Sequence, residues 1–325
     1  MLENVQPIFI LGSPRSGTTM LQVLLSSHPK VASTVQLSLF DRYIGPWIDT
    51  WEMEAADIRD KEWPLGLPVL WKREQFDSII ADFLRRVYTD LLDRAPGATH
   101  ILDKNPGYSM HVETIKRFFP RTRFLHMIRD GRDVACSLMA AKKSMGFGME
   151  EAAAAGVLWR SLVTGARRAA QFGEDYLELR YEDFLTDNAK SYRTALDFCR
   201  LPYDEEWLAH SVEANSFEEM KKRQATGDPG VKTSPHHYRT GKAGNWKAEF
   251  TPRMRFEFDL AAGNVLRDLG YADKFWWAEN DSERAWLPRK HYWRRRRRAL
   301  AYAWEWFKTA ATGGSHKSVA TRVRW

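Results

Sequence analysis

The chain has 325 residues, of which 44% are hydrophobic and 28% charged, a balance typical of a soluble globular protein that can bury a full core. Its two cysteines, Cys136 and Cys199, exclude a disulfide framework and favour a reducing compartment, and the first residues carry no secretory signal. No apolar run is long enough to span a membrane, so we expect a cytoplasmic protein that is not integral to a membrane.

The net charge of +7 is concentrated near the C-terminus. Residues 282–325 hold twelve Lys or Arg and two Asp or Glu, a local net of +10, which leaves −3 for residues 1–281. We therefore expect a main domain at 1–281 and a basic, Trp-rich C-terminal extension at 282–325. Basic residues interleaved with Trp suit an anionic membrane surface, and peripheral attachment there is one hypothesis. An anionic polymer and a solvated extension are the alternatives, and no specific nucleic acid is expected as a partner.

Apolar patterning along the main domain predicts strands that alternate with helices. Strands are expected at 7–11, 100–103, 123–128 and 176–179. Helices are expected at 17–27, 73–93, 108–119, after Asp133 through Lys143, and at 149–172, 188–200, 204–214 and 252–268. The aromatic-rich segment 36–72 is expected to form a lid or insertion of short pieces, and 224–245 a long loop. This alternation predicts an α/β fold with a central parallel sheet flanked by helices.

The loop after the first strand predicts a phosphate site. Residues 8–11 are apolar, residues 12–17 have the G-x-x-x-x-G spacing of a P-loop, and helix formers follow. A strand, tight loop and helix present backbone N–H groups to a phosphate at the helix N-terminus. Thr18 stands where a P-loop kinase or NTPase has its lysine, and the positive charge lies earlier, at Arg15. The loop therefore predicts a nucleotide with a different 5′ group.

Two further segments predict a second phosphate on the same ligand. Arg129 ends a strand and Ser137 lies about two turns into the next helix, at the sheet edge where open α/β sheets bind ligands. Residues 238–247 form a basic loop punctuated by glycine. Guanidinium groups and exposed N–H groups suit a phosphate dianion.

Together these segments resemble the sulfotransferases that use 3′-phosphoadenosine 5′-phosphosulfate (PAPS). Residues 13–19 resemble the family's 5′-phosphosulfate loop, Arg129 through Ser137 its 3′-phosphate motif, and 239–247 its R-x-G-x-x-G-D-W-K loop, with Asn245 where Asp is usual. Residues 181–183 and 216–222 resemble segments around its adenine pocket. The N-terminal half is nearest the bacterial, carbohydrate and tyrosylprotein branches. The resemblance implies a P-loop NTPase-like sulfotransferase fold with about five strands and helical insertions.

The resemblance also implies roles for individual residues. Arg15 and Lys104 would be catalytic, neutralising charge as the sulfuryl group leaves for a hydroxyl, less readily an amine, and 3′,5′-ADP departs. No metal is expected. The acceptor is open among lipid, glycan, peptide and small metabolite. The residues implied to bind PAPS are Arg15, Ser16, Gly17, Thr18, Thr19, Arg129, Ser137, Tyr181, Phe217, Arg239 and Gly241.

The general base is the gap in this assignment. Gln36 occupies the family base position after His28-Pro29, and an amide cannot take a proton. Asp41, Asp103 and His111 are candidates by proximity in the sequence. A nucleotide-binding pseudoenzyme and a P-loop kinase or NTPase-like enzyme are therefore the alternative functions.

Overall fold

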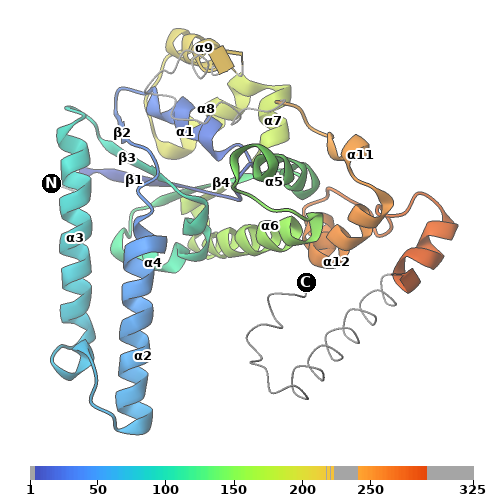
Figure 1. The fold of residues 1–325 in the computed structure, drawn as a ribbon. Coiled ribbons are helices and arrows are strands. Elements are labelled where there is room, and N and C mark those ends of the chain that lie inside the picture. The colour runs from blue at the N-terminus through green and yellow to red at the C-terminus, as the bar shows by residue number, and fades with distance from the viewer. Residues whose placement is uncertain (1–3, 217, 220, 223–240, 291–325) are drawn as a thin grey trace.

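A five-stranded parallel sheet forms the centre of the protein (Figure 1). The computed structural model describes residues 4–216, 218–219, 221–222 and 241–290. The strand order is β2-β3-β1-β4-β5. The strands are β1 (Gln6–Leu11), β2 (Val31–Ser33), β3 (His100–Lys104), β4 (Arg123–Ile128) and β5 (Tyr176–Arg180). The predicted α/β fold with a parallel sheet is thereby confirmed.

Strand register brings the functional segments to one edge. Ile10 of β1 lies beside Lys104 at the end of β3, and Leu11 lies beside His126 of β4. All these strands end at the same edge because they run parallel, so the segments that follow them meet there. The short edge strand β2 was not predicted, because Val31-Ala32-Ser33 is too short to show a periodic pattern.

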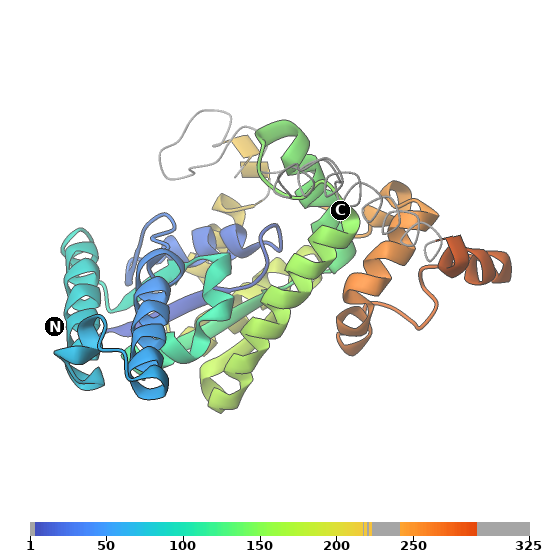
Figure 2. The ribbon, with the colours of Figure 1, turned by 60° about the horizontal axis from the view of Figure 1, so that its bottom comes forward.

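Alternation along β1 divides the core into two layers, one on each face of the sheet. Ile8 and Ile10 pack with the helices α1 (Thr18–Ser26) and α8 (Asn188–Cys199). Phe9 and Leu11 face the opposite way and pack with α3 (Arg73–Asp93) and α4 (Val112–Phe118). Both faces of β1 are therefore buried, which explains its nearly continuous apolar sequence. Figure 2 shows the helices on either side of the sheet.

A third layer supports the far end of β4. It consists of α5 (Gly131–Met145), α6 (Ala152–Arg167) and α12 (Pro252–Asp268), with Trp159 and Phe258 in its buried core. The helix expected at 149–172 ends as an α-helix at Arg167 and continues as the 3₁₀ segment η5 (Arg168–Asp175). Gly173, with a φ of 58°, interrupts that segment, because helical backbone requires negative φ.

The segment expected to be a lid of short pieces is instead dominated by one long helix. A π-helical turn, η2 (Phe40–Ile44), leads into α2 (Gly45–Lys61), and η3 (Leu67–Val69) connects α2 to α3. The prediction was wrong because Pro46 lies in the first turn of α2, where proline is compatible with a helix. Helices α2 and α3 form a two-helix arm that extends away from the sheet (Figure 1).

The described residues also form η4 (Pro106–Met110), α7 (Tyr181–Thr186), α9 (Glu205–Ala214) and α11 (Trp246–Glu249). Residues 281–290 are also helical, and Leu287 is buried against Phe256 and Trp277. The first residues of the expected C-terminal extension thus pack on the main domain. Among the described residues, no helix combines the length and the apolar character needed to cross a bilayer.

Candidate active site

The loop between β1 and α1 is held in a shape that only glycine allows at two positions. Gly12 has a φ of 137°, and a Cβ there would lie 2.5 Å from the carbonyl oxygen of Met127. Gly17 has a φ of 94°, and a Cβ there would lie 2.5 Å from Cδ2 of Tyr181. Both conformations are open to glycine and strained for other residues. The loop therefore wraps closely over the end of the sheet and delivers the N-terminus of α1, which begins at Thr18.

Lys104 brings a buried cation to this helix N-terminus. It is the last residue of β3 and only 5% exposed, and its Nζ donates to Oγ1 of Thr19 over 3.4 Å. Burial lowers the pKa of the Lys104 ammonium to about 8, although the neighbouring Asp103 carboxylate raises it. An anion bound here would restore the charged form, since an opposite charge nearby favours ionisation. The structure thus brings Lys104 together with Thr19.

Arg129 connects three segments of the site. Its Nη1 donates to the backbone oxygen of Arg15 and its Nη2 to that of Lys242, each over 3.0 Å. Its guanidinium lies over the Tyr181 ring, 4.4 Å from the centroid. Trp159 Nε1 donates to the backbone oxygen of Arg129 and so helps to hold the residue at the end of β4. Arg129 therefore links the first loop to the C-terminal loop.

Arg15 and Ser137 are in direct contact, although the family resemblance implies separate roles for them. Nε of Arg15 donates to Oγ of Ser137 over 2.9 Å, across the gap between the first loop and α5. Arg15 adopts a φ of 71°, the left-handed region that is unusual for a residue other than glycine. Sequence spacing could not reveal this contact, because the two residues are 122 positions apart.

Asp133 anchors the C-terminal loop and was missed by the sequence analysis. Its Oδ2 accepts the N–H of Gly244 over 2.6 Å and its Oδ1 that of Trp246 over 3.0 Å. Asp133 is 2% exposed in the first turn of α5. The neighbouring Arg132 lies over the Trp246 ring, 3.8 Å from the centroid. The sequence does show an acidic residue four positions after Arg129, but the backbone groups that Asp133 binds lie more than a hundred residues further along the chain.

Buried polar atoms support the assignment of an anion site. Among the described residues, Oγ of Ser16 and Nε of Arg129 are buried without a hydrogen-bond partner. Such groups normally cost stability unless a partner satisfies them. Both atoms are hydrogen-bond donors, and phosphate oxygens are acceptors. The residues present therefore fit a ligand with phosphate groups at two positions.

Two of the predicted ligand residues, Tyr181 and Gly241, are at least partly buried. Tyr181 is only 7% exposed, because its ring packs against Gly17 and beneath the Arg129 guanidinium. Gly241 is half-buried with a φ of 61°, directly before Lys242. Phe217 and Arg239 lie outside the described residues. Within the described part of the chain, no group of three or more His, Cys, Asp or Glu side chains could hold a metal ion.

The candidate bases have different surroundings. Asp103 is 2% exposed and its Oδ2 accepts hydrogen bonds from the hydroxyls of Tyr88 and Tyr108, over 2.8 and 2.9 Å. Asp103 therefore holds β3 against α3 and η4. Gln36 is exposed in the loop after β2.

Asp41 and His111 lie near each other beside the end of β3. A Cβ at Gly107, three residues after Lys104, would lie 3.0 Å from the Asp41 carboxyl group. Gly45 packs against the His111 ring. Burial lowers the pKa of the His111 imidazole, and the carboxylates of Asp41 and Asp49 raise it. Among the described residues, Oδ1 of Asp41 is buried and has no hydrogen-bond partner.

The fold and this loop define an α/β protein of the phosphate-binding P-loop type. The sequence profile of the Sulfotransferase family matches residues 7–205, and the chain belongs to that family. Protein-tyrosine sulfotransferase A of Caenorhabditis elegans is 26% identical over 206 residues, which are 62% of this chain and 52% of the relative. Protein-tyrosine sulfotransferase 1 of Danio rerio is 24% identical over 217 residues, 64% of this chain and 57% of the relative. The chain thus spans little more than half of these relatives.

Solved structures support the same fold. Mouse sulfotransferase SULT7A1, complexed with PAP, superposes with a TM-score of 0.54 at 18% identity, covering 87% of this chain and 88% of that one. The sulfotransferase domain from the curacin biosynthetic pathway superposes with a TM-score of 0.53 at 20% identity, covering 82% and 98%. The fold implied by the sequence resemblance is confirmed.

Proposed function

We propose that this protein is an enzyme that transfers a sulfuryl group from PAPS to a hydroxyl acceptor and releases 3′,5′-ADP. The observation that carries this proposal is the convergence of the first loop, Lys104 and Arg129 at one sheet edge, in a member of the Sulfotransferase family. A P-loop kinase has a lysine at the position of Thr18, and no finding supports that alternative.

The chain's own residues supply binding and charge compensation. The backbone N–H groups at the start of α1 and the Arg15 side chain hold the 5′ phosphosulfate. Arg129 and Ser137 bind the 3′-phosphate, and the Nε of Arg129 is the donor with no partner among the described residues. Lys104, protonated in the presence of the anion, stabilises negative charge as the bond to the sulfuryl group breaks. When bound, PAPS supplies the activated sulfuryl group.

We assign the general base to Asp41. A base must lie close to the acceptor hydroxyl and have an oxygen or nitrogen free to take its proton. Asp41 has a buried oxygen without a partner in the described part of the chain, and it touches Gly107 just beyond Lys104. His111 interacts electrostatically with Asp41, and its ring packs against Gly45. Asp41→Asn should abolish turnover and leave 3′,5′-ADP affinity intact, whereas Gln36→Glu should not restore it.

Calorimetry and a transfer assay test the proposal. The protein should bind 3′,5′-ADP much more tightly than ATP, and labelled sulfate should move from PAPS to at least one hydroxyl in a panel of alcohols, phenols, sugars and tyrosyl peptides. Tyrosyl peptides belong in the panel because the curated relatives are named protein-tyrosine sulfotransferases. Nucleotide binding without transfer to any acceptor would favour the pseudoenzyme instead.

Arg129→Lys separates the two phosphate sites. It keeps the positive charge but loses the planar fork, so it should weaken binding of 3′,5′-ADP while 5′-AMP binding changes little. Equal losses for both nucleotides would show that Arg129 does not read the 3′-phosphate.

We further propose that the basic C-terminal extension attaches the protein to anionic membrane. Most of it, residues 291–325, lies outside the described residues, and the support is its composition. Replacing the five arginines at 294–298 with glutamine in the full chain should abolish sedimentation with phosphatidylserine vesicles. Unchanged sedimentation would overturn the proposal.

A further inference from the structure

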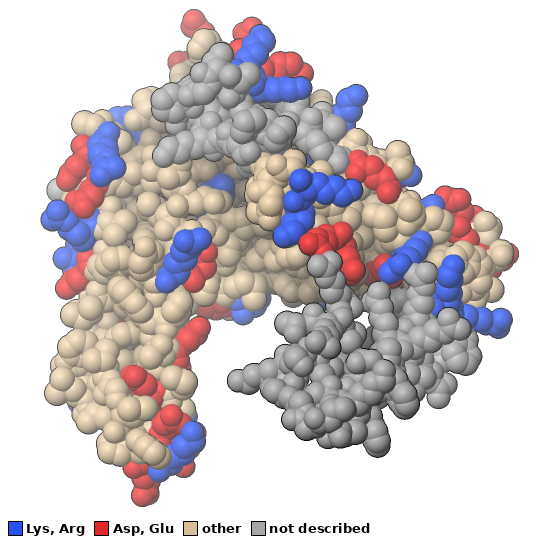
Figure 3. Space-filling model, in the orientation of Figure 1, with Lys and Arg blue, Asp and Glu red and all other residues tan. Residues whose placement is uncertain are grey.

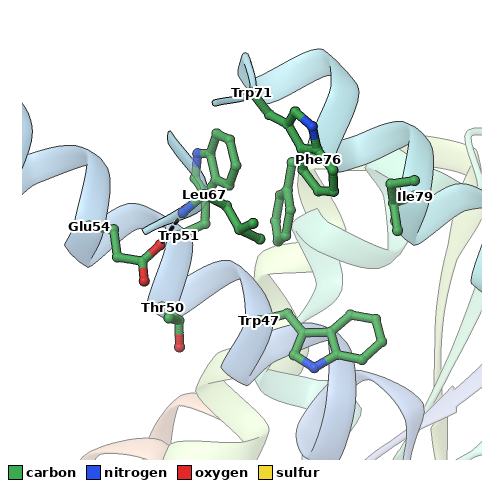
Figure 4. A pocket seen from close by; sticks show the side chains of 8 residues that line it. All are labelled: Trp47, Thr50, Trp51, Glu54, Leu67, Trp71, Phe76 and Ile79. Atoms are coloured by element: carbon green, nitrogen blue, oxygen red, sulfur yellow. Dashed lines mark hydrogen bonds between the residues drawn. The ribbon is translucent and has the colours of Figure 1, made fainter. Parts of the chain in front are cut away.

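The two-helix arm formed by α2 and α3 contains a cavity lined mostly by apolar side chains. Its volume is about 340 Å³, within the range of small-molecule sites. Figure 4 shows side chains from α2, η3 and α3 arranged around a common space. Six of the lining residues are apolar or aromatic: Trp47, Trp51, Leu67, Trp71, Phe76 and Ile79.

The two polar lining residues leave the cavity essentially apolar. Glu54 is engaged elsewhere, because its carboxylate accepts the N–H of Leu67 over 3.1 Å and so ties η3 to α2 (Figure 4). Thr50 is the other polar lining residue. A ligand that fills this cavity gains mainly from removal of apolar surface from water.

Helix α2, which forms part of the cavity wall, begins next to the proposed base. Gly45, the first residue of α2, packs against His111, and Asp41 lies one turn earlier. Trp47 and Trp51 follow in the first two turns, so the cavity begins within about 9 Å of Gly45 along the helix axis. The rings of Tyr43 and Trp47 both pack on Phe83, with centroid distances of 6.1 and 5.3 Å, so aromatic side chains link η2, which contains Asp41, to the cavity wall.

The walls of the cavity are exposed in part. Trp47 is 39% and Ile79 50% exposed. On the face shown in Figure 3, uncharged side chains cover most of the middle of the arm, and charged side chains lie at its far end and along its upper outer edge. Exposed apolar side chains around a cavity are typical of binding sites.

We infer that the acceptor is an amphiphile whose hydroxyl lies at Asp41 and whose apolar chain lies in the cavity between α2 and α3. This inference rests on the proposed sulfotransferase function, because it names the acceptor class of the same site. The acceptor O–H loses its proton to Asp41 while its oxygen forms a bond to the sulfuryl sulfur, and the bond from sulfur to the 5′-phosphate oxygen of PAPS breaks. The products are an alkyl sulfate and 3′,5′-ADP.

The first experiment measures sulfate transfer to primary alcohols of increasing chain length, from ethanol to dodecanol, each below its aggregation limit. Each methylene buried in an apolar site is worth about fourfold in affinity. KM should therefore fall by about fourfold per methylene once the chain reaches the cavity, and then level off when the cavity is full.

Two matched variants locate the effect. Ile79→Asp places a charge in the cavity wall and should raise KM for dodecanol by about tenfold or more, with KM for ethanol unchanged. Leu70→Asp introduces the same charge on the same arm, at a residue that is 76% exposed and outside the cavity lining, and should change neither KM. Thr50→Trp, which fills the cavity without adding charge, should act as Ile79→Asp does.

A binding measurement without PAPS makes the inference independent of turnover. A dansyl-labelled dodecanol should bind the wild type and Leu70→Asp, and should bind Ile79→Asp at least about tenfold more weakly. Equal binding to all three proteins, or transfer with no dependence on chain length, would overturn the inference and leave the proposed function standing. Failure to bind 3′,5′-ADP would instead overturn the proposed function. A dimer in sedimentation that Ile79→Asp dissociates would assign the cavity to a second copy of the chain and also overturn the inference.

Discussion

Replacing Asp133 with alanine should release the C-terminal loop from the nucleotide site. The carboxylate accepts two backbone N–H groups of that loop, from Gly244 and Trp246, and is itself buried. A hydrogen bond to a charged group contributes about 1.5–3 kcal/mol, so the loop loses about 3–6 kcal/mol of local attachment. Arg129 donates to the backbone of Lys242 in the same loop, and its position should loosen with it.

Nucleotide affinity should fall because the binding-competent arrangement becomes a minor state. The apparent Kd rises by the inverse of the population of the competent state. If half of the smaller estimate of about 3 kcal/mol, that is about 1.5 kcal/mol, is lost from the free energy of nucleotide binding, the Kd for 3′,5′-ADP rises about tenfold. Asp133→Asn retains one acceptor oxygen and should give a smaller loss. Isothermal titration calorimetry measures the Kd, and hydrogen exchange at the amides of Gly244 and Trp246 measures release of the loop.

A matched control distinguishes this effect from general destabilisation. Asp187 also accepts a backbone N–H, that of Lys190 over 2.9 Å, but it caps α8. Asp187→Ala should lower the free energy of unfolding by about 1 kcal/mol with no change in the Kd for 3′,5′-ADP. Wild-type affinity in Asp133→Ala, with faster exchange at both loop amides, would refute the reasoning, since the loop would then be released without consequence for binding.

Three other changes have expected outcomes. Burial lowers the pKa of Lys104 to about 8, and a bound anion should raise it again, so binding of 3′,5′-ADP above about pH 7.5 should be accompanied by uptake of a fraction of a proton and should weaken as pH rises. Calorimetry in buffers of different ionisation enthalpy measures this uptake, which Lys104→Arg should abolish. Uptake that persists in Lys104→Arg would assign the proton to another group. Gly17→Ala should lower the free energy of unfolding by about 2–4 kcal/mol, because φ is unfavourable for alanine there and the new Cβ clashes with Tyr181. Gly146→Ala, where φ is 76° and no atom lies within 4 Å of the Cβ, should lower it by only about 1–2 kcal/mol. Denaturant titrations measure both values, and equal losses would contradict the clash at Gly17. Tyr108→Phe removes a hydroxyl that donates to the buried Asp103 carboxylate and accepts the buried Leu39 N–H, and it should lower the free energy of unfolding by about 2–4 kcal/mol in the same titration. A loss below about 1 kcal/mol would show that these two groups find other partners.

Local patterns in the sequence determined most of the elements and the first loop. The helix predicted at 73–93 and the strand predicted at 123–128 have the same bounds as α3 and β4. Both have long, regular apolar patterns whose period is set by the backbone geometry itself. The glycines of the first loop were recognisable for a similar reason, since Gly12 and Gly17 adopt conformations that few other residues allow.

Only the tertiary structure decided how distant segments meet. Asp133 holds the loop at 241–246, and Arg15 contacts Ser137, across separations of more than a hundred residues. The cavity between α2 and α3 likewise depends on the pairing of two helices, whereas the aromatic content of 36–72 predicted a lid or insertion of short pieces. The sequence by itself therefore determined the family, four of the five strands in the described sheet and the loop between β1 and α1, because these depend on neighbours in the chain. Packing between elements, which no local pattern encodes, determines the rest. It sets the anchor of the C-terminal loop, the surroundings of Asp41 and Asp103, and the apolar cavity.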